Sequence, residues 1–334
     1  MTKTILITGA NGEIGHGLIK KLAEDSQNKI VALDINSLDP DLSKLTLQFV
    51  KADILDNRLL DELFKKYHFD TIFHLAALLS TSSERDPVKA HHVNTDGAIN
   101  ILAIAEKFAR ANTKKVKFIF PSSIAIYGLP NLEVKKRVGK IKEEQYNLPA
   151  TMYGCNKLYI ELLGNYYARY YEKHKKSEQY LDFRAIRFPG IISADTLPTG
   201  GTSDFGPEML HAAAQNKPYA CFVRADSKIP FMVMPDAVKV LLKLAKAPSS
   251  SVKHHVYNVG SFSISAGEIA KYAHEINKIK ITYKPHQKRQ AIVDSWPEDV
   301  DDSEARADWG WKPSCDKTKA FEEYLIPAIK ARYG

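Results

Sequence analysis

The chain has 334 residues, of which 44% are hydrophobic and 26% are charged, and its formal net charge is +8. This length is sufficient for two domains, or for one large domain with a lobe, around an ordinary apolar core. No segment approaches the roughly 18 consecutive apolar residues that a membrane-spanning helix requires. Because the first predicted strand begins almost at the initiator methionine, we expect no targeting peptide, no membrane association and a cytoplasmic location.

The cysteines and the basic residues argue against two further classes of protein. The three cysteines are Cys155, Cys221 and Cys315. Their odd number and wide separation disfavour a disulfide framework and a zinc site, and Cys155 is predicted to be a buried helix cysteine. Lysine-rich runs at 114–117, 135–142 and 173–176 lie beside strand starts, loops and helix ends, where solvated basic faces are expected rather than a nucleic-acid groove. Their positive field would attract an anionic cofactor and a substrate carboxylate.

The first strand, turn and helix predict a dinucleotide site. An apolar strand at 4–8 runs directly into a glycine turn, and apolar residues at helical spacing follow it. Gly9 permits the tight turn, and Gly12 removes a side chain where a pyrophosphate must approach backbone N–H groups. Gly15 allows the helix to pack closely on the strand.

The end of the second predicted strand favours NAD over NADP. The strand at 29–34 ends on Asp34, about twenty residues after the glycine turn. A carboxylate at this position can accept both ribose hydroxyls and would repel a 2′-phosphate. The alternative is that Asp34 only begins a polar turn.

Strands and helices alternate through the first half of the chain. Strands are predicted at 4–8, 29–34, 46–50, 70–75, 116–121 and 182–187, and helices at 14–25, 57–67, 88–109 and 152–173. This alternation predicts an α/β protein with a Rossmann-type, doubly wound, mostly parallel sheet covered on both faces. We found no internal repeat and no low-complexity segment.

The alternation stops after residue 190, where a smaller, discontinuous C-terminal substrate lobe is predicted. The Gly/Thr/Ser-rich stretch 198–203 is interpreted as a mobile loop over a cleft, and 256–260 as a strand that returns to the sheet. The predicted domains are 1–190 with about 229–262 for NAD binding, and about 191–228 with 263–334 for the substrate.

Tyr153, Lys157 and Ser123 predict a phenol prepared for proton transfer. On a helix, the four-residue spacing of Tyr153 and Lys157 places phenol and ammonium on one face. Tyrosine titrates near about pH 10, so a base acting near neutrality needs a pKa lowered by about 2 to 3 units. One lysine and an oxidised nicotinamide are expected to supply this shift. The alternative is a surface helix with an unrelated Tyr and Lys.

Two predicted helices carry more apolar surface than one sheet face can bury. Apolar residues surround most of the helix at 94–108, and the same holds for the helix at 152–173. We therefore expect a homodimer that pairs these helices. The alternative is that the second lobe covers them.

Several motifs together resemble one family from end to end. They are the glycine turn, Asp53-Ile54, His74-Leu75-Ala76-Ala77, Asn94, Ser123 with Tyr127-Gly128, and Tyr153 with Lys157. This set resembles an extended short-chain dehydrogenase/reductase. Segments 187–193, 200–205, 231–237, 292–297 and 301–311 are more specific, and are similar to the epimerase-like, metal-independent L-threonine 3-dehydrogenases.

The resemblance implies oxidation of the C3 hydroxyl of L-threonine to 2-amino-3-oxobutyrate with formation of NADH, and no metal. Tyr153 would take the hydroxyl proton, Lys157 would lower the phenol pKa and hold the nicotinamide ribose, and Ser123 would hydrogen-bond the reacting oxygen. The implied cofactor residues are Gly9, Asn11, Gly12, Glu13, Ile14, Gly15, Asp34, Asp53, Ile54, Leu75, Ala76, Ala77, Asn94, Tyr153, Lys157, Pro189 and Ile191.

The implied substrate residues are Ser80, Ser123, Tyr153, Arg187, Thr202, Ser203 and Trp296. Buried charge must be paired, and hydroxyls with Arg187 could satisfy the ammonium and carboxylate of an amino acid. The alternatives are that Thr202 and Ser203 are plain loop residues, that Trp296 is a core aromatic, and that Arg187 is a structural partner of a sheet end.

One departure and two rival functions remain open. The excursion at 131–148 is longer and more basic than the family pattern, and we expect it near the mouth of the site.

A nucleotide-sugar 4-epimerase or dehydratase shares the whole nucleotide half, but would return its hydride. A non-enzymatic NAD-sensing scaffold of the same fold is the other rival, and such scaffolds lack the Tyr/Lys pair that is present here.

Overall fold

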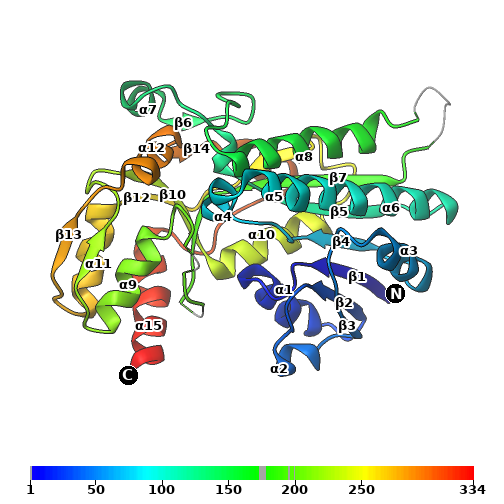
Figure 1. Cartoon of the computed structure of the whole chain (residues 1–334), viewed down its shortest axis with the longest axis horizontal. Coiled ribbons are helices and arrows are strands. Elements are labelled where there is room, and N and C mark those ends of the chain that lie inside the picture. Colours follow the sequence, from blue (N-terminus) through cyan, green and yellow to red (C-terminus); the bar gives the residue numbers. More distant parts are fainter. Residues whose placement is uncertain (1, 173–177, 195, 199) are drawn as a thin grey trace. The chain divides into compact units, whose positions relative to one another are not determined.

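A computed structural model describes residues 2–172, 178–194, 196–198 and 200–334 (Figure 1). The basic run at 173–176, the end of the predicted helix at 152–173, and Thr199 of the predicted mobile loop lie outside the described residues. The chain divides into two compact units. Unit 1 comprises residues 1–122, 155–186 and 241–257, and unit 2 comprises residues 123–154, 187–240 and 258–334.

A seven-stranded sheet forms the core of unit 1, with strand order β11-β7-β5-β4-β1-β2-β3. Its strands are β1 (Lys3–Thr8), β2 (Asn28–Asp34), β3 (Gln48–Lys51), β4 (Thr71–His74), β5 (Val116–Ser123), β7 (Leu181–Phe188) and β11 (Val256–Asn258). β1 pairs in parallel with β2 and β4, with Ile5 opposite Ile30 and Thr71. The predicted Rossmann-type fold is confirmed, including the late strand that returns to the sheet.

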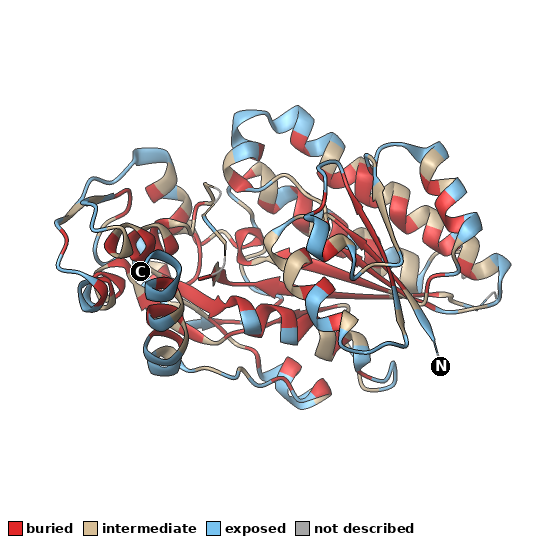
Figure 2. Cartoon of the chain, turned by 90° about the horizontal axis from the view of Figure 1, so that it is seen from below, coloured by how far each residue is buried: buried red, intermediate tan, exposed pale blue. Residues whose placement is uncertain are grey.

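Helices follow the strands in the predicted alternation. They are α1 (Glu13–Ala23), α2 (Pro40–Ser43), α3 (Asn57–Lys66), α4 (Ser80–Arg85), α5 (Pro87–His91), η1 (His92–Asp96), α6 (Gly97–Ala111) and α8 (Met152–Arg169). The strands other than the edge strand β3 are mostly buried, whereas the outer helix faces are exposed (Figure 2). Strands buried on both faces are typical of parallel sheets.

The helix predicted at 88–109 is present as α5, η1 and α6, which follow one another without a break, but the π-helical turn η1 was not predicted. Asn94 lies in this turn and is buried. Its Oδ1 accepts a hydrogen bond from Leu78 N at 2.7 Å, and its Nδ2 donates to Leu78 O at 3.1 Å. Single π-helical turns often occur at functional sites, where they re-aim a side chain.

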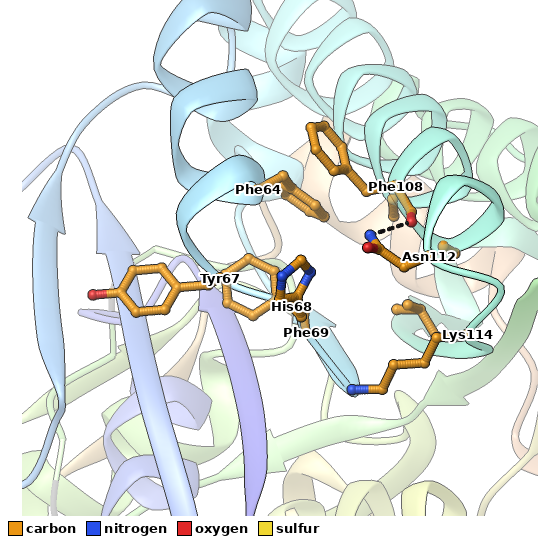
Figure 3. Close-up of a pocket in the computed structure, with 10 residues that line it drawn as sticks. Phe64, Tyr67, His68, Phe69, Phe108, Asn112 and Lys114 are labelled. Atoms are coloured by element: carbon orange, nitrogen blue, oxygen red, sulfur yellow. Dashed lines mark hydrogen bonds between the residues drawn. The ribbon is translucent and has the colours of Figure 1, made fainter.

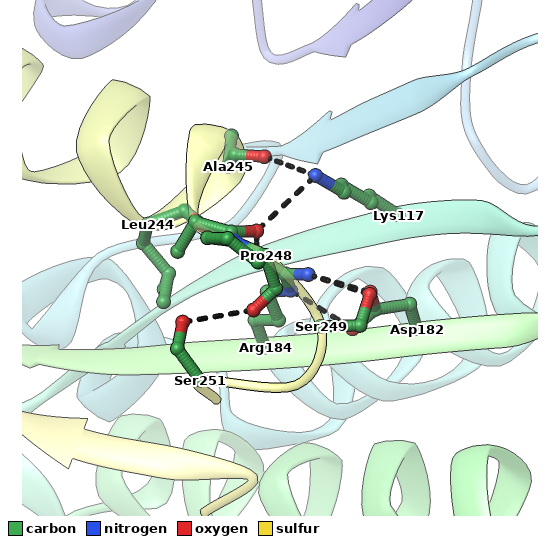
Figure 4. Close-up of polar contacts among 9 residues, drawn as sticks. Lys117, Asp182, Arg184, Leu244, Ala245, Pro248, Ser249 and Ser251 are labelled. Carbon is green, nitrogen blue, oxygen red and sulfur yellow. Dashed lines mark hydrogen bonds and ion pairs between the residues drawn. The ribbon is translucent and has the colours of Figure 1, made fainter. Parts of the chain in front are cut away.

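Two basic side chains satisfy the C-terminal end of α10 (Met234–Lys246), whose last carbonyls have no partners within the helix (Figure 4). Arg184 donates to Leu244 O at 2.6 Å and forms a two-point ion pair with Asp182. Lys117 donates to Ala245 O at 2.6 Å, and burial lowers its pKa. Lys117 therefore differs from the solvated basic face predicted for 114–117, because it serves as a helix cap.

A small apolar cavity of about 20 Å³ lies in unit 1 (Figure 3). Its lining comes mainly from α3, α6 and the loop before β4, and includes Phe64, Tyr67, Phe69, Ala105 and Phe108. This volume is close to that of one water molecule, and an apolar lining offers water few partners. The cavity is therefore a packing gap rather than a ligand site.

The described residues of unit 2 form three small sheets. They are β12-β10-β8, with β8 (Gly190–Ile192), β10 (Lys228–Val233) and β12 (Phe262–Ser265); β13-β9, with β9 (Tyr219–Cys221) and β13 (Ile281–Tyr283); and β14-β6, with β6 (Lys140–Ile141) and β14 (Asp299–Val300). Its helices are α7 (Leu132–Val138), α9 (Phe205–Ala214), α11 (Ala266–Ile276), α12 (Gln287–Ser295), α13 (Ser303–Trp309), α14 (Lys317–Lys319), η4 (Ala320–Leu325) and α15 (Ile326–Tyr333), with the first part of α10. Unlike the predicted domain limits, unit 2 also takes in residues 123–154.

The basic excursion at 131–148 is folded against α12. α7 begins with Asn131 as a cap, and Lys135 of this helix is buried. Lys135 Nζ donates to Val293 O at 2.8 Å, and Leu129 N donates to Ser295 O at 2.8 Å. Burial lowers the pKa of Lys135 to about 8. The solvated face predicted for this run therefore does not extend to Lys135.

Among the described residues, the helices are too short or too polar to cross a membrane.

Candidate active site

The glycine turn between β1 and α1 has the geometry that a dinucleotide site needs. Gly9 has a φ of +67°, and a Cβ there would lie 2.5 Å from Ala76 N. A Cβ on Gly15 would lie 2.4 Å from Ala10 O. Gly12 is exposed at the start of α1 and, as the N-cap residue, makes no side-chain cap hydrogen bond to that helix. The N–H groups at a helix start favour an anionic group such as pyrophosphate.

Asp34 lies at the carboxyl end of β2 and organises the chain around it. Its Oδ2 accepts from Asn11 N at 2.9 Å, and its Oδ1 accepts from Asn36 N at 2.8 Å. A carboxylate has about four acceptor sites, so two backbone bonds leave capacity for further donors. Asp34 therefore begins a polar turn, as the alternative interpretation predicted. Its remaining acceptor sites still fit a diol such as ribose.

The ends of β1 and β4 lie side by side. Thr8 is opposite His74 in the register, and Thr8 Oγ1 is 2.8 Å from His74 Nδ1. Leu75 N donates to Thr8 O at 3.0 Å, which holds the start of the loop containing Ala76 and Ala77. Burial lowers the pKa of His74 to about 3, so its imidazole is neutral. These residues form the carboxyl edge of the sheet, where ligands of open α/β sheets bind.

Other predicted cofactor residues lie on the same unit but differ in exposure. Asp53 is exposed and accepts from Leu55 N at 3.0 Å, whereas Ile54 is buried. A Cβ on Gly97 would lie 2.4 Å from the Ile54 side chain, so this glycine permits α6 to approach Ile54. Asn94 also donates to Asn156 Oδ1 at 3.2 Å, which links η1 to α8.

Tyr153 and Ser123 lie together in unit 2. Tyr153 is half-buried in the first turn of α8, and burial raises its pKa, whereas a hydrogen bond with Ser123 lowers it. Ser123 Oγ also accepts from Ala125 N at 3.1 Å. The lowered phenol pKa predicted from the sequence is therefore not found in the protein alone. The hydrogen-bond partner expected of Ser123 is present.

Lys157 lies one helical turn after Tyr153 in the same helix and is buried. Its Nζ donates to Pro121 O at 2.7 Å and lies 4.4 Å from the centre of the Phe120 ring. Burial lowers the pKa of Lys157 to about 7, and the charge of Glu161 opposes this shift. Glu161 is itself buried and accepts a hydrogen bond from Ser122 Oγ.

The sequence interpretation missed Glu161 and was wrong about Cys155. Glu161 follows Lys157 by four residues, and this i,i+4 spacing was the signal that could have indicated it. Cys155 is exposed rather than buried, because its position lies on the other side of α8 from Lys157.

Arg187 is buried and forms hydrogen bonds within its own unit. Its Nη1 donates to Tyr127 Oη at 2.8 Å and to Glu143 O at 2.6 Å, and the guanidinium lies over the Tyr127 ring. Tyr127 Oη in turn donates to Asn258 Oδ1 at 2.6 Å. These contacts agree with the alternative interpretation of Arg187 as a structural residue that fixes the end of a sheet, rather than as a substrate residue.

The other predicted substrate residues are divided between the units. Ser80 is buried at the start of α4 in unit 1, and Thr202 and Ser203 lie in a turn of unit 2 before α9. In that turn, Asp204 accepts from the N–H groups of Gly200 and Gly201 at 2.9 and 2.6 Å. The described part of this segment is therefore a hydrogen-bonded turn.

Trp296 and the segment after β7 complete the predicted set. Trp296 follows α12 and is buried, and its Nε1 has no hydrogen-bond partner among the described residues. Pro189 and Ile191 flank Gly190, and Ile191 of β8 pairs with Met232 of β10. A Cβ on Gly190 would lie 2.6 Å from the Phe231 ring, so this glycine allows the ring to pack against the backbone.

Three features together define the extended short-chain dehydrogenase/reductase class. They are a parallel sheet of this order, a glycine turn before α1, and the set of Ser123 on β5 with Tyr153 and Lys157 on α8. The profile described as the NAD dependent epimerase/dehydratase family matches residues 5–260, and the chain belongs to this family. Its cofactor is NAD, and the protein is an enzyme of this family.

Relatives and solved structures extend the similarity to the whole chain. The mitochondrial L-threonine 3-dehydrogenase of Bos taurus is 33% identical over 321 residues, which cover 93% of this chain and 79% of that protein. The structure of L-threonine dehydrogenase from Clostridium difficile is 34% identical, with a TM-score of 0.86, and covers 100% of this chain and 99% of that one. A monomeric L-threonine 3-dehydrogenase from a metagenome is also 34% identical, with a TM-score of 0.86 and coverage of 99% and 100%.

Proposed function

We propose that the protein oxidises the C3 hydroxyl of L-threonine to 2-amino-3-oxobutyrate, with NAD as the hydride acceptor. The observation that carries this proposal is the hydrogen bond between Tyr153 and Ser123. Tyr153 lies on α8, the helix that also contains the buried Lys157. The full-length similarity to L-threonine dehydrogenases supports the choice of substrate.

In this reaction the protein must accept one proton from the substrate hydroxyl. Tyr153 takes the proton of the C3 hydroxyl, and Ser123 hydrogen-bonds the same oxygen and keeps it within reach of the phenol. Because burial raises the phenol pKa, the site needs cationic charge to make Tyr153 a base near neutrality. Lys157 supplies one such charge. Bound NAD supplies the hydride acceptor and a second positive charge.

The cofactor residues fit a dinucleotide. Gly12 is exposed and presents no side chain at the start of α1, where a pyrophosphate would meet backbone N–H groups, and Asp34 has acceptor capacity for ribose hydroxyls. In the proposed site, Asn11, Glu13 and Ile14 line this turn, Asp53 and Ile54 contact the adenine, and Leu75, Ala76, Ala77 and Asn94 contact the nicotinamide half, with Pro189 and Ile191 beside the ring.

The substrate side of the proposal uses one indole N–H and three hydroxyl side chains. The indole N–H of Trp296 is a buried donor with no partner among the described residues, and such a group costs free energy unless a ligand or water satisfies it. We include Thr202, Ser203 and Ser80 as hydroxyl donors to the amino acid. Arg187 contributes less to substrate binding in this proposal, because its Nη1 already donates to two protein oxygens.

The test is to mix the purified protein with NAD and L-threonine and to follow NADH absorbance. We expect NADH to accumulate with L-threonine and not with a UDP-sugar. Turnover of a UDP-sugar without net NADH would favour the nucleotide-sugar 4-epimerase or dehydratase alternative. NAD binding without turnover of either substrate would favour the scaffold alternative.

We also propose a homodimer that pairs α6 and α8. Tyr159, Leu162 and Tyr166 form an exposed stripe on α8 and are 43%, 59% and 47% exposed in the single chain. Burial of such a stripe is favourable by about 25 cal/mol per Å² of apolar surface. Sedimentation velocity at micromolar concentration should give a dimer, and Leu162→Glu should give a monomer. A parent protein that sediments as a monomer, as one similar dehydrogenase is described, would contradict this proposal.

A further inference from the structure

The last residues of β5 hold two charged side chains of α8 inside unit 1. Pro121 O accepts from Lys157 Nζ at 2.7 Å, and Ser122 Oγ donates to the Glu161 carboxylate. Lys157 is 4% exposed and Glu161 is 1% exposed. Adjacent residues of one strand therefore fix a cation and an anion that lie four residues apart on one helix.

A buried ammonium is costly unless an opposite charge compensates it, because a carbonyl alone replaces only part of its hydration. Among the described residues of unit 1, Glu161 shifts the pKa of Lys157, and Lys157 in turn shifts the pKa of His74. His74 of β4 is neutral, and the Lys157 charge contributes to its lowered pKa. Glu161 of α8 opposes the effect of burial on Lys157. Phe120 of β5 lies under the Lys157 ammonium with its ring face and has no titratable group.

We propose that Glu161 is a positioning residue for catalysis, whose carboxylate, fixed by Ser122, keeps Lys157 in the cationic form and directed at Pro121 O. This inference rests on the proposed function, because it is the Lys157 charge that would promote proton loss from Tyr153. Glu161 touches neither substrate nor cofactor in this role. It acts through Lys157.

The direction of the effect follows from the charges. Removal of a carboxylate next to a buried ammonium favours the neutral amine, so the pKa of Lys157 falls further below its ordinary value. At neutral pH a larger share of Lys157 is then uncharged. The pH range over which Tyr153 is assisted by a cation becomes narrower on its alkaline side.

The direct test is an NMR titration of the protein with ¹³C-labelled lysine side chains, with Lys157→Met to identify the Lys157 signal. In Glu161→Gln the amide can still accept from Ser122, but the charge is gone. We expect the Lys157 titration midpoint to fall by at least about one pH unit, a tenfold loss of proton affinity. The matched control is Glu133→Gln, which removes an 85% exposed carboxylate on α7 and should leave the midpoint unchanged.

An unchanged midpoint in a folded Glu161→Gln protein would overturn the proposal. If that variant does not fold, Ser122→Ala keeps the carboxylate and removes the donor that fixes it, and a smaller fall of the midpoint is expected. No shift in Ser122→Ala would then overturn the proposal. The titration needs no substrate, so it remains valid if L-threonine is not oxidised.

The activity readout separates positioning from simple damage. If the parent protein oxidises L-threonine, the alkaline limb of its kcat/KM profile should move to lower pH in Glu161→Gln. A uniform loss at every pH, with an unmoved limb, would indicate a structural role and would count against the proposal.

Discussion

Replacement of Tyr153 by Phe should lower kcat for NADH formation from L-threonine by about 10²- to 10⁴-fold, the usual contribution of a general base. Phe retains the ring and removes only the hydroxyl that bonds Ser123. NAD affinity should therefore change little. The measurement is steady-state NADH absorbance together with NAD titration of the same protein.

The control for this prediction is Tyr159→Phe. Tyr159 lies on the same helix but is 43% exposed, so removal of its hydroxyl should leave kcat unchanged. A Tyr153→Phe protein with full activity would falsify the role of the phenol in proton transfer. Loss of activity in both variants would point to damage of α8 instead.

Replacement of Gly9 by Ala should lower the free energy of unfolding by about 2 to 4 kcal/mol. A left-handed backbone costs a non-glycine residue about 1 kcal/mol. The added Cβ would also meet Ala76 N at 2.5 Å and Leu75 C at 2.8 Å, which are backbone atoms of a segment held by the hydrogen bond from Leu75 N to Thr8 O. Overpacking of this kind typically costs about 1 to 3 kcal/mol. Urea unfolding of the cofactor-free protein measures the change.

Gly12→Ala is the matched control, and it should separate stability from cofactor binding. Gly12 has a φ of −78°, and its added Cβ would meet only Gly9 O, at 3.3 Å. Stability should therefore change by less than about 1 kcal/mol. NAD affinity should fall at least about tenfold, because the methyl group stands where the pyrophosphate approaches the N–H groups. Unchanged NAD affinity in Gly12→Ala would contradict the proposed pyrophosphate site.

The local features of this protein were predictable because each depends on residues close together in the chain. Alternating apolar strands and amphipathic helices follow from periodicities of two and 3.6 residues. Gly9 is required at a turn with positive φ, and Asp34 ends a buried strand. Tyr153 and Lys157 share a helix, so their spacing alone indicated their relation.

The features that were missed depend on contacts between distant segments. The helix predicted at 88–109 contains an unpredicted π-helical turn, in which Asn94 bonds Leu78, sixteen residues earlier. Lys117 and Lys135 donate to carbonyls more than 120 residues later, at Ala245 and Val293, and Lys135 is buried there. Periodicity and composition contain no information about such partners.

The sequence by itself determined the parallel sheet, the glycine turn and the Ser123, Tyr153 and Lys157 set. Only the tertiary structure decided which charges are buried together. Ser122 and Glu161 are 39 residues apart, and their contact exists because β5 and α8 pack against each other. A charge changes its proton affinity according to the groups that replace water around it, and those groups are assembled only when the chain folds.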